Sequence, residues 1–445
     1  MPQFIPKLLA NLKNLPQVDR FLIAYSGGVD SHALLQALGQ SRHEHGKTIT
    51  AVHINHNLYR DAKKWSAHCA GVCNTLDIPC ECITVNAQAA PGESPEAAAR
   101  QARYDALSKY VQSNDCLLTA HHQDDQAETL LLQLLRGSGP KGLAAMPLWT
   151  DFAQGYLARP LLSFSREQIV TYARQQQLVW IDDVSNKDTA FDRNYLRLKI
   201  LPLLKQRWPS TAKTVSRTAQ LCAEASAILD ETAADDLQNI LGERSYKVCI
   251  AKLTQLSQTR QHNVVRHWLD SLDLRYPSQA ILSQLWRSVI PAAEQAQPVL
   301  TWSSGEIRRY REFLYAQAPV ADFDTTQVFA CQPNQIIHIP LVGSVSLQSV
   351  KGQGLAIEKI NGEPLSVRFR QGGERCRLFK RHGEHTVKKL FQELGVLPWM
   401  RDRIPLIYIG ERLAAVGNYF ICEDFAATPQ QPGLVVSCDY DQSPL

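Results

Sequence analysis

The chain has 445 residues, of which 44% are apolar and 20% charged, and these proportions are typical of a globular protein rather than a disordered one. Its formal net charge of +4 is too small to indicate a nucleic-acid partner by itself. No apolar run is long enough to span a membrane and the N-terminus lacks a signal peptide, so we expect a cytoplasmic protein without membrane association. The length predicts about three domains, and the sequence leaves the oligomeric state open.

The eleven cysteines are scattered along the chain and include no Cys-x-x-Cys pair. We therefore expect neither a disulfide framework nor a zinc or iron–sulfur site, as is usual in a reducing compartment. Cys69 and Cys73 are four residues apart, which indicates one packed face of a helix.

The first elements in chain order are a helix, a strand and a second helix. Apolar residues recur with helical spacing over residues 4–15, the apolar run 21–25 predicts a strand, and residues 33–38 predict a helix. A glycine-rich loop joins that strand to that helix, and its residues are Ser26, Gly27, Gly28, Val29, Asp30 and Ser31.

The glycine-rich loop has the composition of a phosphate-binding turn. Adjacent glycines let the backbone approach a ligand, and the N-terminus of the following helix adds partial positive charge. Asp30 would repel phosphates unless Mg²⁺ lay between them, so we expect Asp30 to contribute to a metal site. A Walker P-loop is excluded because the chain has no Gly-x-x-x-x-Gly-Lys-Ser/Thr run.

The alternation of strands and helices continues to about residue 150 and predicts a parallel sheet covered by helices, with its ligand at the carboxyl ends of the strands. A strand over residues 48–54 ends in His53-Ile54-Asn55-His56-Asn57, where adenine or ribose contacts are expected. A His-x-x-His zinc half-site is the alternative, but no further ligands follow at a useful spacing.

A second polar segment, residues 121–129, follows the predicted strand 116–120 and begins a helix. Asp125 and Glu128 are three residues apart on that helix and share a face, so we favour a functional role for this pair. For Asp124, capping of the helix N-terminus is an equally good interpretation.

The glycine-rich loop resembles the Ser-Gly-Gly-x-Asp-Ser signature of the PP-loop superfamily, whose members split ATP into AMP and pyrophosphate. The chain as a whole resembles the tRNA(Ile)-lysidine synthetase family within it. The motifs that carry this resemblance, in chain order, are His121-His122-x-Asp124-Asp125-Gln126-x-Glu128-Thr129, Leu135-Arg136-Gly137-Ser138-Gly139, Gly142-Leu143, Met146-Pro147, Arg159-Pro160-Leu161-Leu162, Asp183-Val184-Ser185-Asn186, Arg193-Asn194-Tyr195-Leu196-Arg197 and Ile200-Leu201-Pro202.

This resemblance implies a ligase that adenylates the wobble cytidine in the CAU anticodon of tRNA(Ile), after which free L-lysine displaces AMP and gives lysidine. ATP and Mg²⁺ are the implied cofactors. The glycine-rich loop would hold pyrophosphate, while Asp125 and Glu128 would receive the lysine ammonium. Arg193 and Arg197, four apart on a helix, would contact phosphate or the cytidine.

The predicted fold is an α/β, parallel-sheet PP-loop ATP pyrophosphatase domain over residues 1–208, followed by two further domains. Long helices without strands at residues 212–241, 257–272 and 278–289 predict a helical substrate-binding domain over residues 209–318, which closes with a β-like stretch at 299–315. Short alternating strands, with one helix at 387–394, predict an α+β domain over residues 328–445.

Positive charge is concentrated in this last domain. Residues 361–412 contain eleven Lys or Arg and six Asp or Glu, an excess of five that exceeds the surplus of the whole chain. We expect its basic side chains to follow the tRNA backbone; they are Arg368, Arg370, Arg375, Arg377, Lys380, Arg381, Lys388 and Lys389. Trp399, beside Arg401 and Arg403, would either stack on a base or pack internally. A solvated basic face is the alternative.

Two other functions fit parts of the sequence. The first is another PP-loop enzyme that modifies tRNA or forms an amide, although the missing Cys-x-x-Cys pairs argue against a thiolating enzyme. The second is a non-catalytic tRNA-binding protein that senses ATP, against which the intact Asp30, Asp125 and Glu128 count.

Overall fold

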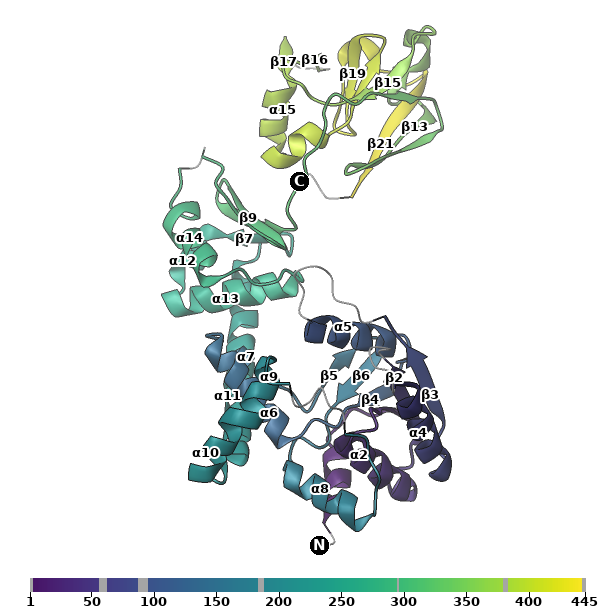
Figure 1. Cartoon of the computed structure of the whole chain (residues 1–445). Coiled ribbons are helices and arrows are strands. Elements are labelled where there is room, and N and C mark those ends of the chain that lie inside the picture. Colours follow the sequence, from purple (N-terminus) through teal and green to yellow (C-terminus); the bar gives the residue numbers. More distant parts are fainter. Residues whose placement is uncertain are drawn as a thin grey trace. The chain divides into compact units, whose positions relative to one another are not determined.

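The computed structural model describes residues 3–55, 62–86, 95–182, 188–293, 296–378 and 383–441 (Figure 1). The chain divides into two units, Met1–Glu231 and Thr232–Leu445, and the boundary falls within helix α11 (Thr211–Ile240). The division into three domains at residues 208 and 328 therefore stays a prediction.

The first unit is built on a six-stranded sheet. Its strands are β1 (Arg20–Ala24), β2 (Thr48–Asn55), β3 (Cys80–Thr84), β4 (Asp115–Leu118), β5 (Trp149–Phe152) and β6 (Gly155–Ala158). Their order is β3-β2-β1-β4-β6-β5, and every neighbouring pair is parallel except β5 with β6. The predicted parallel sheet is confirmed. The chain leaves β1 toward β2 on one side and returns to β4 on the other, so β1 and β4 flank a topological switch point.

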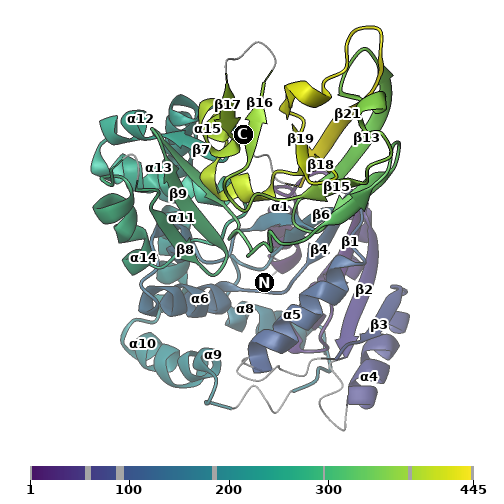
Figure 2. The same ribbon diagram turned by 90° about the horizontal axis from the view of Figure 1, so that it is seen from above.

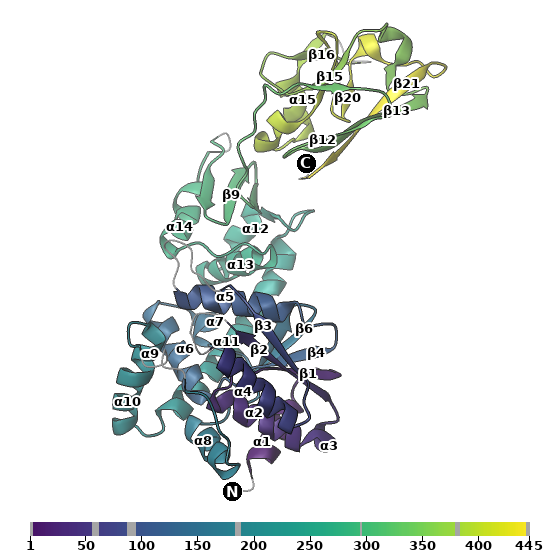
Figure 3. The same cartoon turned by 45° about the vertical axis from the view of Figure 1, so that its right-hand side comes forward.

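Helices cover both faces of this sheet (Figure 3). The helices of the unit are α1 (Phe4–Leu12), α2 (Val29–Gln40), α3 (Arg42–His45), α4 (Ala62–Thr75), α5 (Pro95–Ser108), α6 (Gln123–Leu135), α7 (Pro140–Leu143), α8 (Arg166–Gln175), α9 (Asp192–Tyr195), the π-helix η2 (Leu196–Ile200), α10 (Leu201–Arg207) and α11. The larger apolar core joins α1, α2, α4 and α8 to one face, and a smaller core joins α5 to the other. Strand β1 alternates its side chains between these two cores, which is why it is apolar along its whole length.

The second unit begins with helices that pack on a four-stranded sheet. The helices are α12 (Ile250–Gln255), α13 (Gln258–Ser271), α14 (Gln279–Gln284) and the π-helix η3 (Leu285–Val289), and the strands are β7 (Lys247–Cys249), β8 (Val299–Trp302), β9 (Gly305–Tyr310) and β10 (Phe313–Gln317). The prediction of helices without strands before residue 290 is wrong, because β7 pairs with β10. Strand β7 has three residues, too few for an alternating pattern to be recognised in the sequence without its partner β10.

The rest of the second unit is rich in β-structure, as expected. One sheet contains β11 (Phe329–Cys331), β15 (Leu365–Arg368), β18 (Leu406–Ile409), β19 (Arg412–Val416) and β20 (Phe420–Ile421), and another contains β12 (Ile336–Ile339), β13 (Gly343–Lys351), β21 (Pro432–Tyr440) and β14 (Leu355–Ala356). The hairpin β16 (Arg375–Arg377) and β17 (Glu384–Thr386) lies beside α15 (Val387–Leu394), as Figure 2 shows. Within the described residues this part of the chain also contains the 3-10 helices η4 (Ile357–Lys359), η5 (Pro398–Arg403) and η6 (Glu423–Phe425).

Helix α15 has the predicted ends. The Thr386 hydroxyl accepts a hydrogen bond from the Lys389 N–H at 3.3 Å, and the helix stops at Gly395, whose φ of +76° favours glycine. Both bounds are confirmed.

Cys376 and Cys422 form a disulfide with their Cα atoms 5.4 Å apart. The sequence predicts no disulfide framework, and this one bridge was not expected from it. The two residues are 46 positions apart, and a backbone β-bridge between Cys422 and Leu378 brings them close. Tertiary structure therefore forms the pair, and no sequence spacing indicates it.

No helix within the described residues is both long enough and apolar enough to cross a membrane.

Candidate active site

The candidate site lies at the carboxyl ends of β1 and β4, where the strand order of the first unit reverses. The glycine-rich loop, residues 26–31, follows β1, and His121 and His122 follow β4. Ligands of open parallel sheets bind at such a point, because the two neighbouring loops diverge and leave room between them. The structure therefore brings the two main sequence signals together.

The glycine-rich loop is held by its own serines. The Ser31 hydroxyl donates to the Gly28 carbonyl at 3.1 Å and accepts from the Ser26 N–H at 3.2 Å, and the two serine hydroxyls lie 3.0 Å apart. Helix α2 begins within this loop at Val29, so the N–H groups of its first turn have no carbonyl partner within the helix. The loop thus offers donors and a helix N-terminus to an anion.

Gly27 cannot be replaced without strain. Its φ is +84°, and a Cβ atom there would lie 2.7 Å from Ile181 Cδ1 and 3.0 Å from Cys69 Sγ. The Ile181 N–H also donates to the Gly27 carbonyl at 2.9 Å. Gly28 has an ordinary φ of −73° and more space, so the conformational demand falls on Gly27 alone.

Asp30 stands in the first turn of α2 and faces the second polar segment. Its Oδ2 lies 3.7 Å from His122 Nε2, while its Oδ1 is buried and has no hydrogen-bond partner among the described residues. A buried carboxylate oxygen without a partner is costly, and a cation such as Mg²⁺ would satisfy it.

His122 is 2% exposed and lies among carboxylates. Its Nε2 is 3.4 Å from Asp125 Oδ2 in addition to the Asp30 contact. Burial opposes a charge on this imidazole, but Asp125, Asp30 and Asp124 outweigh it and raise the pKa of His122. The neighbouring His121 differs, because burial lowers its pKa to about 3 and keeps it neutral, with Nδ1 2.8 Å from Thr119 Oγ1.

Two carboxylates and two guanidiniums form a buried acid–arginine cluster, whose members are Asp125, Glu128, Arg193 and Arg197. Glu128 is 0% exposed. Its oxygens accept from Arg197 Nε and Nη2 at 2.6 and 2.8 Å, and from Arg193 Nε at 3.1 Å. Arg197 Nη2 also donates to Asp125 Oδ1 at 2.8 Å. The cluster joins the start of α6 to α9 and η2, and the two arginines are on consecutive helices rather than on one regular α-helix.

The two carboxylates of this cluster have opposite pKa directions. For Asp125, burial would raise the pKa, but His122, His121 and Arg197 lower it overall. For Glu128, burial dominates and raises the pKa in spite of its arginine partners. A pair of neighbouring acids with diverging pKa values is a common arrangement for proton transfer.

Asp124 has a structural environment. It accepts hydrogen bonds from Lys205 Nζ and, at 3.2 Å, from the Arg166 N–H at the start of α8. Burial opposes its charge, but Lys205 and the Arg166 N–H lower its pKa overall. These contacts give Asp124 a structural role other than the capping considered for it: it ties α6, α8 and α10 together, while at the start of α6 the Asp125 Oδ2 accepts from the His122 N–H at 2.9 Å.

At the end of β2, where adenine or ribose contacts stay a prediction, one histidine has a structural contact. His53 is 5% exposed, and its Nδ1 lies 3.0 Å from the Tyr25 carbonyl, so it holds β2 against β1. His56 and Asn57 lie outside the described residues, as do Asp183, Val184, Ser185 and Asn186 of the motif series. No group of three or more candidate metal ligands of the His, Cys, Asp or Glu type occurs within the described ranges.

Four of the eight residues of the predicted basic track of the second unit pair with acids. Arg368 pairs with Glu411 at 2.7 Å, Arg370 with Asp402 at 2.5 Å, Arg377 with Glu423 at 3.0 Å and Arg375 with Glu384 at 3.5 Å. Lys388 and Lys389 on α15 are exposed, whereas Lys380 and Arg381 lie outside the described residues.

Trp399 packs internally. Arg308 lies 5.2 Å from the centre of its ring, and Tyr315 is in edge contact with it. Arg401 and Arg403 are 7% and 6% exposed, and both donate to backbone carbonyls, at Val396 and Leu341 respectively. These contacts favour internal packing of Trp399 over stacking on a base, and its role stays a prediction.

Sequence reasoning missed two residues of the first unit that belong to this region. Lys205, the partner of Asp124, belongs to a helix, and nothing in the sequence around it indicates a role for its side chain. Arg159 belongs to a motif of the family resemblance, but nothing in the residues alone assigned it a role.

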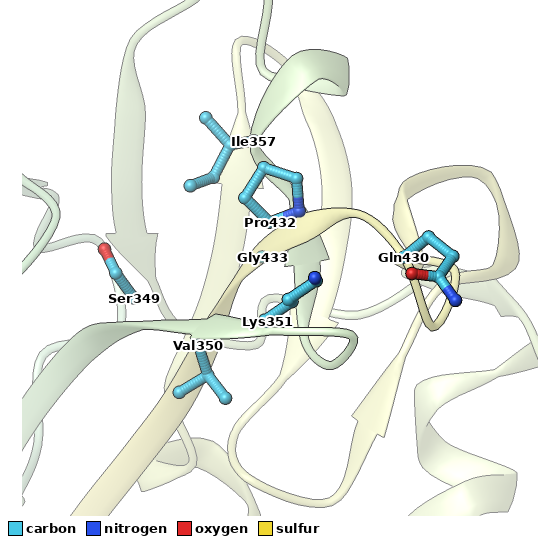
Figure 4. Close-up of a pocket in the computed structure, with 7 residues that line it drawn as sticks. All are labelled: Ser349, Val350, Lys351, Ile357, Gln430, Pro432 and Gly433. Carbon is cyan, nitrogen blue, oxygen red and sulfur yellow. The ribbon is translucent and has the colours of Figure 1, made fainter.

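A hollow on the second unit, shown in Figure 4, contains none of the predicted site residues. It is lined by Ser349, Val350, Lys351, Ile357, Gln430, Pro432 and Gly433. With one charged side chain and no acid, it offers no catalytic chemistry.

Comparison with known proteins covers nearly the whole chain. Three family models match, namely the PP-loop domain at residues 2–204, the TilS substrate binding domain at 249–315 and the TilS substrate C-terminal domain at 365–438. A tRNA(Ile)-lysidine synthase of Coxiella burnetii is 41% identical over 96% of this chain and 95% of its own length. Those of Methylococcus capsulatus and Photobacterium profundum are 38% and 42% identical, over 94% and 93% of this chain and 95% of each relative. The chain therefore belongs to the tRNA(Ile)-lysidine synthase family.

Proposed function

We propose that the protein is an ATP-dependent ligase that joins free L-lysine to carbon 2 of the wobble cytidine in the CAU anticodon of tRNA(Ile). The observation that supports this most directly is the meeting of the glycine-rich loop with the acid–arginine cluster at one switch point, in a chain of this family. ATP and tRNA are its substrates in addition to lysine, and we place its activity in the cytoplasm, where all three are available.

The first step joins the cytidine to AMP. The oxygen on carbon 2 attacks the α-phosphorus of ATP, the bond to the β-phosphate oxygen breaks, and pyrophosphate leaves. Ser26, Gly27, Gly28, Val29 and Ser31 would hold the phosphates through backbone N–H groups and hydroxyls. Asp30, with its unpartnered Oδ1, would contribute to a Mg²⁺ site. Mg²⁺ commonly uses one or two carboxylates together with substrate phosphates, and it would offset the charge on the departing pyrophosphate.

The second step replaces AMP by lysine. The ε-ammonium has a pKa of about 10.4 in water and must lose a proton before its nitrogen can attack carbon 2. Asp125 stays ionised and is the more accessible acid, so it would bind the ammonium. Glu128, whose pKa is raised by burial, is the better proton acceptor of the two.

Arg193 and Arg197 would act on the adenylate. Glu128 uses part of each guanidinium and fixes its plane, and the remaining N–H groups are then available to a phosphate or to the cytidine ring. Oriented donors of this kind stabilise charge that develops in a transition state without having to reorganise.

We propose the domain boundaries 1–208, 209–318 and 328–445 for catalysis, substrate binding and tRNA binding. Exposed Lys388 and Lys389 are the best candidates for phosphate contacts in the last of these, because most of the neighbouring arginines already have acid partners.

Incorporation of labelled lysine into unmodified CAU-anticodon tRNA(Ile), with and without ATP, tests the proposal. The methionine tRNA with the same anticodon is the control. ATP-dependent labelling of the isoleucine tRNA alone is expected. AMP release with another acceptor and without lysine transfer would leave an adenylating enzyme with a different substrate, and no AMP release at all would favour a non-catalytic ATP sensor.

A further inference from the structure

Arg159 is a buried cation without an acid partner. It directly follows β6, which pairs with β4 in the register Leu118 opposite Ala158, so it lies beside the β4 end that leads to His121. It is 8% exposed, and its Nη1 donates to the Pro147 carbonyl at 3.0 Å. Its Nε is buried without a partner, and no Asp or Glu of the described residues pairs with it.

Burial of such a guanidinium is unfavourable unless an anion accepts its remaining hydrogen bonds and balances its charge. Arginine stays charged and has five N–H donors, and one backbone carbonyl satisfies little of that capacity. Burial lowers the pKa of Arg159; Tyr104 acts in the opposite direction and the positive charge of Arg100 in the same direction, and the pKa is lowered overall. The site is therefore short of one negative charge.

The surroundings add positive charge instead of removing it. Arg159, Arg193 and Arg100 all act on His121 and oppose its protonation. Glu128 neutralises Arg193, whereas Arg100, which lies over the ring of Tyr104 at 5.0 Å, has no acid partner in the described part of the chain. Arg159 is thus the buried guanidinium beside the end of β4 that has no acid partner among the described residues, and the exposed Arg100 adds to the positive charge that acts on His121.

We propose that Arg159, assisted by Arg100, binds the α-carboxylate of the free amino acid. This inference rests on the proposed function and extends it to the second end of the lysine molecule. A free amino acid with a basic side chain carries a positive charge on that side chain and a carboxylate at its other end. Asp125, in the first turn of the helix that follows β4, offers a negative charge, and Arg159, directly after β6, offers a positive charge. A phosphate group of ATP or tRNA has related chemistry and is the competing occupant.

Cadaverine separates these occupants, because it keeps both terminal ammonium groups of the aliphatic chain and lacks a carboxylate. We would measure the KM for lysine, the inhibition constant of cadaverine against lysine, the KM for ATP and the Kd for tRNA. The variants are Arg159→Met, Arg159→Lys and Arg100→Gln, with the exposed Arg174→Gln on α8 as the matched control.

In Arg159→Met the KM for lysine should rise about 10- to 100-fold, the effect of losing a charge-assisted hydrogen-bond pair. The cadaverine constant, the KM for ATP and the Kd for tRNA should stay within about twofold, since uncharged methionine leaves the ammonium site intact. Arg159→Lys should restore part of the lysine affinity, and Arg174→Gln should change nothing.

Three results would overturn the inference. An equal loss for lysine and cadaverine would make Arg159 a structural residue, and a raised KM for ATP or a weaker Kd for tRNA would assign it to a phosphate. If Arg159→Met fails to fold, Arg100→Gln decides the question, because an unchanged ratio of lysine to cadaverine affinity there also rejects the site. A wild-type enzyme that incorporates no lysine would reject the proposed function instead.

Discussion

Replacing Glu128 with Gln tests the role of the acid–arginine cluster most directly. The side chain is 0% exposed and accepts three hydrogen bonds from Arg193 and Arg197. Glutamine keeps its shape but removes the negative charge, so two guanidiniums remain with Asp125 as their one acid of the cluster.

The expected loss of stability follows from burial. Removing one partner of a buried ion pair costs roughly 3–5 kcal/mol, because the remaining charge stays desolvated. A unit of 231 residues loses about 2–4 °C of unfolding temperature per kcal/mol, so the transition of the first unit should fall by roughly 6–20 °C. Turnover should fall at least about 100-fold at a temperature where the variant is folded, since the variant lacks the proposed proton acceptor.

Differential scanning calorimetry, lysine incorporation and tRNA binding are the three measurements, and Glu306→Gln is the matched control. Glu306 is 2% exposed and accepts from Arg308 Nε and Nη2 at 2.6 and 2.9 Å, so it is a second buried Glu–Arg pair. Its loss should destabilise the second unit while turnover by the folded protein stays near the wild-type value. Glu128→Gln should retain tRNA binding.

The reasoning fails if Glu128→Gln keeps more than about a tenth of the wild-type turnover while folded, a change of less than 1.4 kcal/mol in the barrier. It also fails if Glu306→Gln loses turnover to the same extent, because the loss would then reflect destabilised structure in general. A Glu128→Gln variant with unchanged unfolding temperature would contradict the energetic argument alone.

Four further results are expected. Asp125→Asn should retain tRNA binding and lose turnover; equal loss of both would remove Asp125 from the lysine site. Gly27→Ala should weaken ATP binding about tenfold in calorimetric titration, because the φ of +84° and a Cβ atom 2.7 Å from Ile181 Cδ1 would strain the loop. Gly28→Ala should bind ATP normally, and equal losses of affinity in the two variants would contradict this explanation. Lys388→Gln combined with Lys389→Gln should reduce the salt slope of tRNA binding by about 1 to 2, and an unchanged slope would place those phosphate contacts elsewhere. The raised pKa of His122 means that its protonated form stabilises the fold. This stabilisation is complete below about pH 6.5 and is lost as the pH rises through the raised pKa, so the free energy of unfolding of the wild type should fall more than that of His122→Gln over this range. Parallel curves of unfolding free energy against pH would refute the prediction.

Local patterns predicted the elements around the candidate site. The apolar run of β1, the adjacent glycines and the apolar helix after Ser31 occur within 18 consecutive residues of the sequence, so short-range preferences determine them. The rule that parallel strands end at one edge then brings residues 121–128 to the same place without knowledge of any contact.

The partners of the charged side chains could not be predicted in this way. Arg197 lies 69 residues from Glu128, and Lys205 lies 81 residues from Asp124. Counting charges found the basic excess of residues 361–412, but it gave no information on which arginines acids would neutralise, because Glu411 and Glu423 meet Arg368 and Arg377 only in the folded sheets. Trp399 was ambiguous for the same reason.

The long separation between Asp124 and Lys205 also matters during synthesis. A ribosome adds roughly 5–20 residues per second, so the 81 residues from Asp125 to Lys205 take about 4–16 s to appear. During that interval the start of α6 carries three acids, Asp124, Asp125 and Glu128, whose lysine and arginine partners are still to be added to the chain. The nascent chain can therefore pair β1 with β2 early, but the acid–arginine cluster is assembled only after η2 has emerged, and the Asp124–Lys205 contact only after α10. A chain that ends before Arg193 would expose unpaired carboxylates to chaperones and proteases.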